Sequence, residues 1–249
     1  MLRENNRVPN QLRPTEALVG VVCEANGSAQ YSQGNTAVVS SIYGPSKPRY
    51  SRHEDCAKLT LEVDLVTTNY GKVDAIFINS DRGEKVSMAA TMTNKKRYEK
   101  YIENILKEIL LNCLSLANHP GMLMLFKVMV LRDDGSLLAC AVNSCYLALL
   151  NIGLPIKNSI YAINLGTYNI NESSVYLDLT ALEEESIDYK GTFIFGESTV
   201  DSQGLKLIHS CGSGAVTASN LEHITRNAME TCFTIKQFFK LTIQSYLDK

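Results

Sequence analysis

The stretch RDDGSLLACAVNSCYLALLNIGLP, from Arg132 to Pro155, decides how the surrounding chain folds. It opens with acidic, glycine and serine residues, which favour a turn followed by a helix N-cap. The residues after Ser136 are mostly apolar, and the segment ends at Gly153 with a proline just beyond, as helices often end. The stretch therefore predicts a turn that leads into a largely buried helix.

The start of this helix combines two opposing signals. A helix N-terminus presents backbone N–H groups and the positive end of the helix dipole, which together suit an anion such as phosphate. Leu137 and Leu138 occupy the next positions, where an enzyme that uses phosphate needs cationic or hydroxyl side chains. The sequence thus predicts the backbone of an anion site without its side chains.

The segments around this helix alternate strands with long helices. Residues 122–131 form a nearly continuous apolar run, which predicts a strand covered on both faces. Apolar residues recur at helical spacing over 94–118 and again from about 219 to 247. The other predicted strands are 17–24, a short strand between turns at 26–27 and 33–35, 36–43, 58–66, 159–165, 174–179, 191–195 and 205–210. The order predicts an α/β (α+β) fold in which mixed sheets pack against long helices.

Length and composition set the domain organisation. We expect residues 1–14, which are polar, to be a flexible N-terminal arm that packs on a partner, and residues 15–249 to form a single domain. Residues 67–93 are rich in turn formers and are predicted to be an insertion of undefined role. The formal net charge is −2, so any nucleic acid must bind through a local patch rather than a global basic field.

The cysteines and the apolar stretches indicate the compartment. There are seven cysteines, an odd number, and none has the spacing of a zinc site. We therefore expect buried free thiols in a reducing compartment and no metal. The first residues lack the apolar core of a signal peptide, and no apolar run reaches membrane-spanning length without interruption. Cytoplasm or nucleus is the expected location, with no membrane.

Carboxylates gather in YLDLTALEEES, from Tyr176 to Ser186. Asp178 ends a predicted strand and Glu184 follows six positions later, and such groups can hold a divalent metal or act as a general acid. A solvated acidic turn is the alternative, which spacing alone favours. The four histidines lie in no recognisable motif and no GxSxG occurs, which argues against a hydrolase triad.

Cations gather at the opening turns of the helix predicted over 94–118. Lys95, Lys96 and Arg97 lie where positive charge opposes the helix dipole, which indicates a use such as holding phosphates. A plain solvated face explains the same residues equally well.

Three stretches together resemble the ribonuclease PH family. They are GSAQYSQGNTAVVSSIYGP at 27–45, DDGSLLACAVNSCYLALLNIGLP at 133–155 and VYLDLTALEEES at 175–186, and their order and spacing also match. The resemblance runs from about Arg13 to the last helix and implies a ribonuclease PH-like fold of the ribosomal protein S5 domain 2-like type. The second stretch is particularly similar to a ring subunit of the eukaryotic RNA exosome that lacks phosphorolytic activity.

The resemblance also implies roles for single residues. In active members, which degrade RNA from its 3′ end with phosphate as the nucleophile, the helix start reads Gly-Thr-Arg-Thr-Ala. Here Leu137 replaces the arginine, and Ser136 is the remnant of the phosphate site. Each lost charge-assisted hydrogen bond costs about 1.5–3 kcal/mol of binding. Asp178 and Glu184 match the family's two acids and are interpreted as a vestigial pair, while Tyr98 is expected to replace a second phosphate ligand.

The implied function is that of a non-catalytic ring subunit of an RNA exosome, which scaffolds and guides RNA during 3′–5′ processing and degradation. Expected partners are other ribonuclease PH-like ring subunits, RNA-binding cap subunits and single-stranded RNA contacted by Lys95, Lys96 and Arg97. No cofactor is expected, and the location implied is the nucleus, including the nucleolus, and the cytoplasm. The alternative is an active 3′–5′ exoribonuclease in a homo-oligomeric ring, using phosphate or a magnesium ion held by Asp178 and Glu184.

Overall fold

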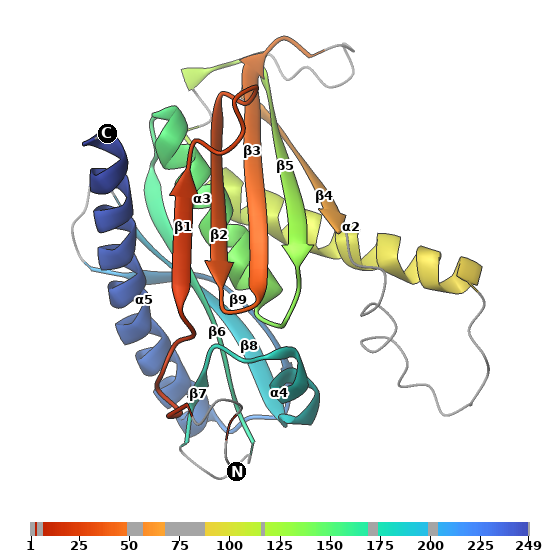
Figure 1. The fold of residues 1–249 in the computed structure, drawn as a ribbon, viewed down its shortest axis with the longest axis vertical. Helices are drawn as coiled ribbons and strands as arrows, with labels where there is room; N and C mark the ends of the chain where they lie inside the picture. The colour runs from red at the N-terminus through yellow and green to blue at the C-terminus, as the bar shows by residue number, and fades with distance from the viewer. Residues whose placement is uncertain are drawn as a thin grey trace.

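The computed structural model describes residues 3, 7–48, 57–67, 88–115, 118–168, 174–198 and 204–248. Two sheets form its framework, one five-stranded in the order β1-β2-β3-β5-β4 and one four-stranded in the order β7-β6-β8-β9 (Figure 1). The strands are β1 Thr15–Val19, β2 Gly27–Gln33, β3 Thr36–Ser46, β4 Thr60–Thr67, β5 Leu123–Arg132, β6 Asn158–Thr167, β7 Tyr176–Leu177, β8 Tyr189–Ser198 and β9 Lys206–Gly214. The helices are α2 Met88–Cys113, α3 Leu137–Ile152, α4 Ala181–Ser186 and α5 Ala218–Leu247. The predicted mixed sheets packed against long helices are confirmed.

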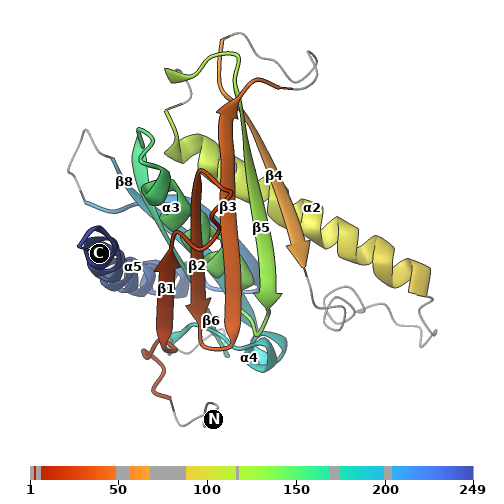
Figure 2. The ribbon, with the colours of Figure 1, turned by 45° about the horizontal axis from the view of Figure 1, so that its top comes forward.

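Helix α3 lies at the centre, between the two sheets (Figure 2). It contacts β2 and β3 on one side and β6 on the other, which explains why it is apolar around most of its circumference. Its buried Asn143 is satisfied by the backbone of Ala162, with which it forms two hydrogen bonds of 3.0 Å. Gly27 lets β2 pack directly against the backbone of α3, because a Cβ atom at this position would lie 2.6 Å from the carbonyl oxygen of Ala148.

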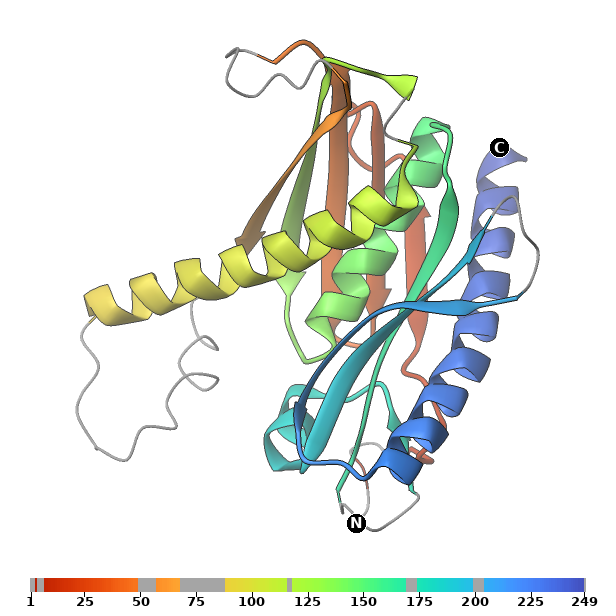
Figure 3. The same ribbon diagram turned by 180° about the vertical axis from the view of Figure 1, so that it is seen from behind.

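The two longest helices pack on either side of α3 (Figure 3). Helix α2 packs against β4, and α5 packs against β6, β8 and β1. The Phe239 ring of α5 lies 5.9 Å from the ring of Tyr31 and 5.8 Å from that of Tyr161, so α5 joins aromatic side chains of both sheets. Within the described residues, no helix is both long and apolar enough to cross a membrane.

Strand β5 departs from its prediction. The sequence predicts a strand covered on both faces, but buried and exposed residues alternate along it. Phe126 and Val128 point into the core, whereas Met129 is 47% exposed and Leu131 is 37% exposed. The prediction was wrong because outward side chains such as Met129 and Leu131 are apolar, although none of the described helices covers that face.

Other differences concern element ends and one missed element. Helix α2 begins at Met88, earlier than the predicted residue 94, and residues 68–87 of the predicted insertion lie outside the described residues. Helix α4 was missed because it is only six residues long. It begins with a capping box, in which the Thr180 hydroxyl accepts from the Glu183 backbone and the Glu183 carboxylate accepts from the Thr180 backbone.

Candidate functional site

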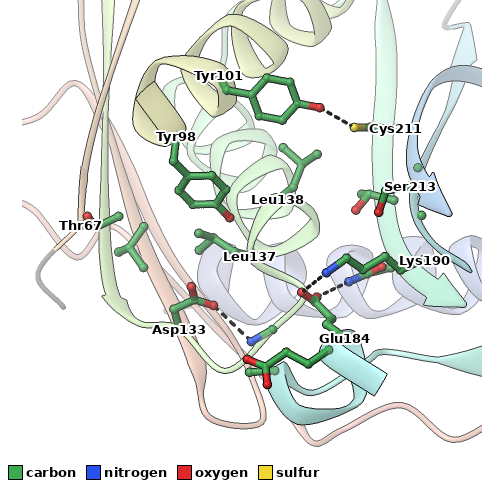
Figure 4. A pocket seen from close by; sticks show the side chains of 18 residues that line it. Thr67, Tyr98, Tyr101, Asp133, Leu137, Leu138, Glu184, Lys190, Cys211 and Ser213 are labelled. Atoms are coloured by element: carbon green, nitrogen blue, oxygen red, sulfur yellow. Dashed lines mark hydrogen bonds and ion pairs between the residues drawn. The ribbon is translucent and has the colours of Figure 1, made fainter. Parts of the chain in front are cut away.

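A pocket of about 320 Å³ opens where the start of α3 meets α2, α4 and the strands β8 and β9 (Figure 4). Helix α2 contributes two tyrosines, α3 contributes two leucines, and α4 contributes two glutamates. The second sheet completes the pocket with Asn164 from β6, Lys190 from β8 and Cys211 from β9. The pocket therefore lies at the helix start that the sequence identified as the scaffold of an anion site.

Ser136, the residue before α3, does not act as predicted. Its backbone is left-handed, with φ at 57°, and its side chain makes no capping hydrogen bond to the helix. Its hydroxyl instead donates to Asp178 Oδ1 at 3.1 Å and to the carbonyl oxygen of Leu179 at 2.9 Å. Its backbone N–H donates to Glu184 Oε1 at 2.7 Å. The protein's own carboxylate thus takes the backbone donor that a phosphate would use.

Glu184 has several polar partners in the pocket besides the Ser136 N–H. Its Oε1 atom also accepts from Asn164 Nδ2 at 2.7 Å, while its Oε2 atom lies 3.6 Å from Lys190 Nζ. Burial raises the pKa of Glu184 above its ordinary value of 4.5, although the Ser136 N–H, Lys190 and Asn164 all favour the charged form. Nearby Asp133 adds to the rise in this pKa. Figure 4 shows the carboxylate facing the start of α3.

The opposite wall of the pocket is aromatic and aliphatic. Tyr98 and Tyr101 come from α2 and lie beside Leu137 and Leu138 (Figure 4). Burial raises the pKa of Tyr98 above its ordinary value of 10.0, so the phenol is neutral at pH 7. The Tyr101 hydroxyl lies 2.9 Å from Cys211 Sγ, and this hydrogen bond, together with burial, raises the pKa of Tyr101 to about 12.

The charges of the pocket disfavour anions. The carboxylates of Asp133, Glu184 and Glu185 line it, against Lys190 as the cation among the described lining residues. The Asp133 carboxylate accepts from the Gly135 N–H at 3.1 Å, so a second backbone donor near the helix start also faces a carboxylate. A phosphate would meet net negative charge here and no arginine among the described lining residues.

Asp178, the first acid of the predicted vestigial pair, is not among the residues that line this pocket. Its side chain is fully buried. Arg13 binds it in a bidentate manner, with Nη2 at 2.6 Å from Oδ1 and Nε at 2.8 Å from Oδ2. The Arg13 backbone N–H donates to Oδ2 as well. Both oxygens of Asp178 are therefore engaged by Arg13.

The described residues of the N-terminal arm contact their own chain. The sequence predicts a flexible segment that packs on a partner. Arg3 is buried and places Nε 2.8 Å from Glu183 Oε1 and Nη2 3.0 Å from Glu183 Oε2. It also donates to the carbonyl oxygens of Leu177 and Asp178. The arm thus anchors α4, the helix that carries Glu184 into the pocket.

Glu183 titrates differently from its neighbour Glu184. Burial on its own would raise the pKa of Glu183. The hydrogen bonds from Arg3 and the Thr180 N–H, together with the charges of Arg3 and Arg7, outweigh burial and hold this pKa below its ordinary value of 4.5. We call Arg3, Arg7, Arg13, Asp178 and Glu183 the arm network.

The predicted RNA-contacting cations lie elsewhere. Lys96 and Arg97 are exposed on α2 and are not among the residues that line the pocket. The side chain of Lys95 lies outside the described residues. Tyr98, which the resemblance to the ribonuclease PH family places at a second phosphate ligand, lines the pocket.

Several lining residues carry no sequence signal. Lys190, Asn164 and Cys211 come from three strands of the second sheet and belong to no motif. Tyr101 lies within the helix predicted from apolar spacing, yet it is 52% exposed. Of the described cysteines, Cys113, Cys140, Cys145 and Cys232 are buried thiols, as predicted, while Cys211 is partly exposed and Cys23 is exposed. No group of three or more potential metal ligands occurs within the described residues.

Comparison with known proteins places the chain. Residues 11–155 match the 3′ exoribonuclease family, domain 1. A rice protein named exosome complex exonuclease RRP46 homolog is 28% identical and covers 97% of this chain and 95% of its own length. The fission yeast exosome complex component ski6 is 27% identical over 78% of this chain and 74% of its own length. The crystal structure of rice Rrp46 superposes with a TM-score of 0.77 at 28% identity, covering 97% of this chain and all of that one. This chain therefore belongs to the 3′ exoribonuclease family and has the ribonuclease PH-like fold that its sequence predicts.

Proposed function

We propose that this chain is a ring subunit of an RNA exosome, which scaffolds the ring and guides RNA in 3′–5′ processing and degradation without phosphorolysis of its own. One observation carries the proposal. At the helix start, Glu184 occupies the Ser136 N–H and Leu137 stands where active members have arginine. A phosphate nucleophile would have to displace a carboxylate without a charge-assisted hydrogen bond in return.

The proposed partners follow from the relatives. Proteins named as exosome components match over most of this chain, so the partners are other ribonuclease PH-like ring subunits, cap subunits and single-stranded RNA. The subunit needs no cofactor, and it works in the nucleus, including the nucleolus, and in the cytoplasm. Lys95, Lys96 and Arg97 are the proposed RNA contacts, of which Lys96 and Arg97 are exposed on α2.

The second candidate is an active exoribonuclease in a homo-oligomeric ring. It is favoured by the retained Glu184 beside Lys190, an acid and a cation in one pocket, and by a relative named an exonuclease. Against it stands the net negative charge of the pocket.

Purification of the tagged chain from native lysate, with mass spectrometry of the co-purifying chains, separates the two candidates. A ring subunit brings down other ribonuclease PH-like chains in equal amounts. The purified chain is then incubated with 5′-labelled RNA with and without phosphate. We expect no phosphate-dependent shortening. A homo-oligomer that releases nucleoside diphosphates, and whose Glu184→Gln variant does not, would establish the second candidate instead.

A further inference from the structure

The volume and lining of the pocket suit a bound ligand, so the pocket is more than the remnant of a lost phosphate site. Its volume of about 320 Å³ is within the range of small-molecule sites, which span about 300–1,000 Å³. One wall carries the Tyr98 and Tyr101 rings with the side chains of Leu137 and Leu138, and Glu184 lies across from them (Figure 4). A flat ring with polar edges suits such a pocket better than a tetrahedral anion does.

The carboxylate of Glu184 has one oxygen available to a ligand. Oε1 already accepts two hydrogen bonds of 2.7 Å, from Ser136 N and Asn164 Nδ2. Oε2 has Lys190 Nζ at 3.6 Å, which is beyond the usual limit of about 3.2 Å for a hydrogen bond. One fifth of the Glu184 side chain is exposed, so Oε2 can accept from an N–H donor on a ligand.

The surrounding charge selects against anionic ligands. Asp133, Glu184 and Glu185 line the pocket, and Lys190 offsets one of these charges. A ligand that brings its own phosphate into the pocket therefore meets repulsion, whereas a neutral ring with a donor group does not.

We propose that the pocket binds a nucleobase that carries an exocyclic amino group, with the ring packed against Tyr98 and Tyr101 and the amino group donating to Glu184 Oε2. The inference rests on the proposed function in that RNA guided by the subunit is the source of the base. The sugar–phosphate backbone then lies outside the pocket. The site thereby reads a base where active members hold phosphate.

The test uses the full chain with methyl-labelled leucine, so that the Leu137 and Leu138 methyl groups report on the pocket by NMR. Cytidine and uridine form a matched pair, because they differ at C4 in an amino group against a carbonyl oxygen. We expect cytidine to shift these methyl signals saturably, with about tenfold higher affinity than uridine. Cytidine 5′-monophosphate binds more weakly than cytidine, and inorganic phosphate shifts neither signal.

Two variants locate the effect. Glu184→Gln keeps an oxygen for Ser136 and Asn164 but removes the charge, so the preference for cytidine over uridine is lost. Tyr101→Leu lowers the affinity for both nucleosides equally, because the ring is lost and the acceptor is kept. The control Glu108→Gln changes an exposed acid of α2 outside the pocket and leaves the preference intact.

Equal affinity for the two nucleosides, tighter binding of the monophosphate or of inorganic phosphate, or the absence of saturable shifts would each overturn the inference. These outcomes do not touch ring membership, which the co-purification measures independently. Conversely, a chain that forms only homo-oligomers but binds cytidine more tightly than uridine would contradict the proposed function and support nucleobase binding in the pocket.

Discussion

Asp178 and Glu184 contact the same serine from two sides and lie in opposite surroundings. Asp178 accepts the Ser136 hydroxyl and is buried against Arg13, which satisfies both of its oxygens. Glu184 accepts the Ser136 backbone N–H and faces a pocket, with one oxygen 3.6 Å from Lys190 Nζ. The arm side of Ser136 is a closed ionic network, and the pocket side is open to ligand.

The difference shows how one acidic segment serves two purposes. A buried carboxylate with full compensation is costly to disturb and positions backbone, whereas a partly compensated one is available for binding. The arm network holds α4, and α4 holds Glu184 in the pocket. Stability therefore resides on one side of Ser136 and ligand contact on the other.

The largest effect is expected at Arg13. Arg13→Met leaves the Asp178 charge buried without its bidentate partner, which should cost about 3–5 kcal/mol of unfolding free energy. Urea denaturation measures this loss. Adding Asp178→Asn recovers part of it, since the uncompensated charge is gone. The control Arg226→Ala, which breaks an exposed ion pair with Glu222 on α5, costs under about 0.5 kcal/mol. A loss below about 1 kcal/mol for Arg13→Met would mean that the network does not hold the arm.

A smaller loss, about 1.5–3 kcal/mol, is expected for Arg3→Met, because the charge-assisted bonds to Glu183 disappear. The pH dependence sharpens this. The pKa of Glu183 is held below 4.5, so its stabilisation is fully present above pH 4.5 and is lost as pH falls through the folded-state value. The free energy of unfolding of the unmodified chain and of Arg3→Met is measured between about pH 3 and pH 7, a range that includes the ordinary pKa of 4.5. It should fall less steeply with decreasing pH for the variant. Identical pH profiles would assign the acid sensitivity to other groups.

Substitution of the exposed cations of α2 tests whether RNA phosphates bind outside the pocket rather than in it. Lys96→Glu with Arg97→Glu should weaken single-stranded RNA binding by the assembled ring about tenfold and leave assembly intact. The slope of log affinity against log salt should fall by about 0.7 for each phosphate that the protein no longer neutralises. Measurement of RNA affinity at several salt concentrations gives both numbers. Lys107→Glu with Lys240→Glu changes exposed cations of α2 and α5 as a charge-matched control. An unchanged salt slope would remove Lys96 and Arg97 from the RNA path.

The smallest effect is expected for Tyr101→Phe, which changes a residue that lines the pocket. The Tyr101 hydroxyl lies 2.9 Å from Cys211 Sγ, and the residue is 52% exposed. Because sulfur is a weak hydrogen-bond partner and the site is half open to water, loss of the hydroxyl should change the unfolding free energy by less than about 0.5 kcal/mol. Thermal denaturation checks this. A loss comparable with that of Arg3→Met would show that the pocket wall is as structural as the arm network.

The sequence by itself determined the elements and their order. Helical spacing of apolar residues identified α2 and α5, and the turn at 133–136 with Gly153 at the far end bounded α3 to within a residue. The turn predicted at 33–35 lies where the β2–β3 hairpin turns in the structure, between the paired residues Gln33 and Thr36. These signals are local, because turn chemistry and periodicity act over a few residues.

The resemblance to the ribonuclease PH family, rather than local spacing, implied a role for Tyr98, which lines the pocket with Leu137. The local reading itself found Leu137 at the start of α3. It failed at β5, where outward apolar residues looked like a second buried face. It also missed α4, whose capping box spans too few residues to show a period.

Only the tertiary structure decided what the two acids do. Asp178 meets Arg13 across 165 positions, and Glu183 meets Arg3 across 180. No spacing in the sequence records such pairs, because their partners lie far apart along the chain and meet only in the folded structure. Lys190 and Asn164 likewise reach Glu184 from β8 and β6 of the four-stranded sheet, far from it in the sequence or on a separate element. The charge of a carboxylate is a property of its residue, but its role depends on the partners that burial leaves within about 3 Å of it.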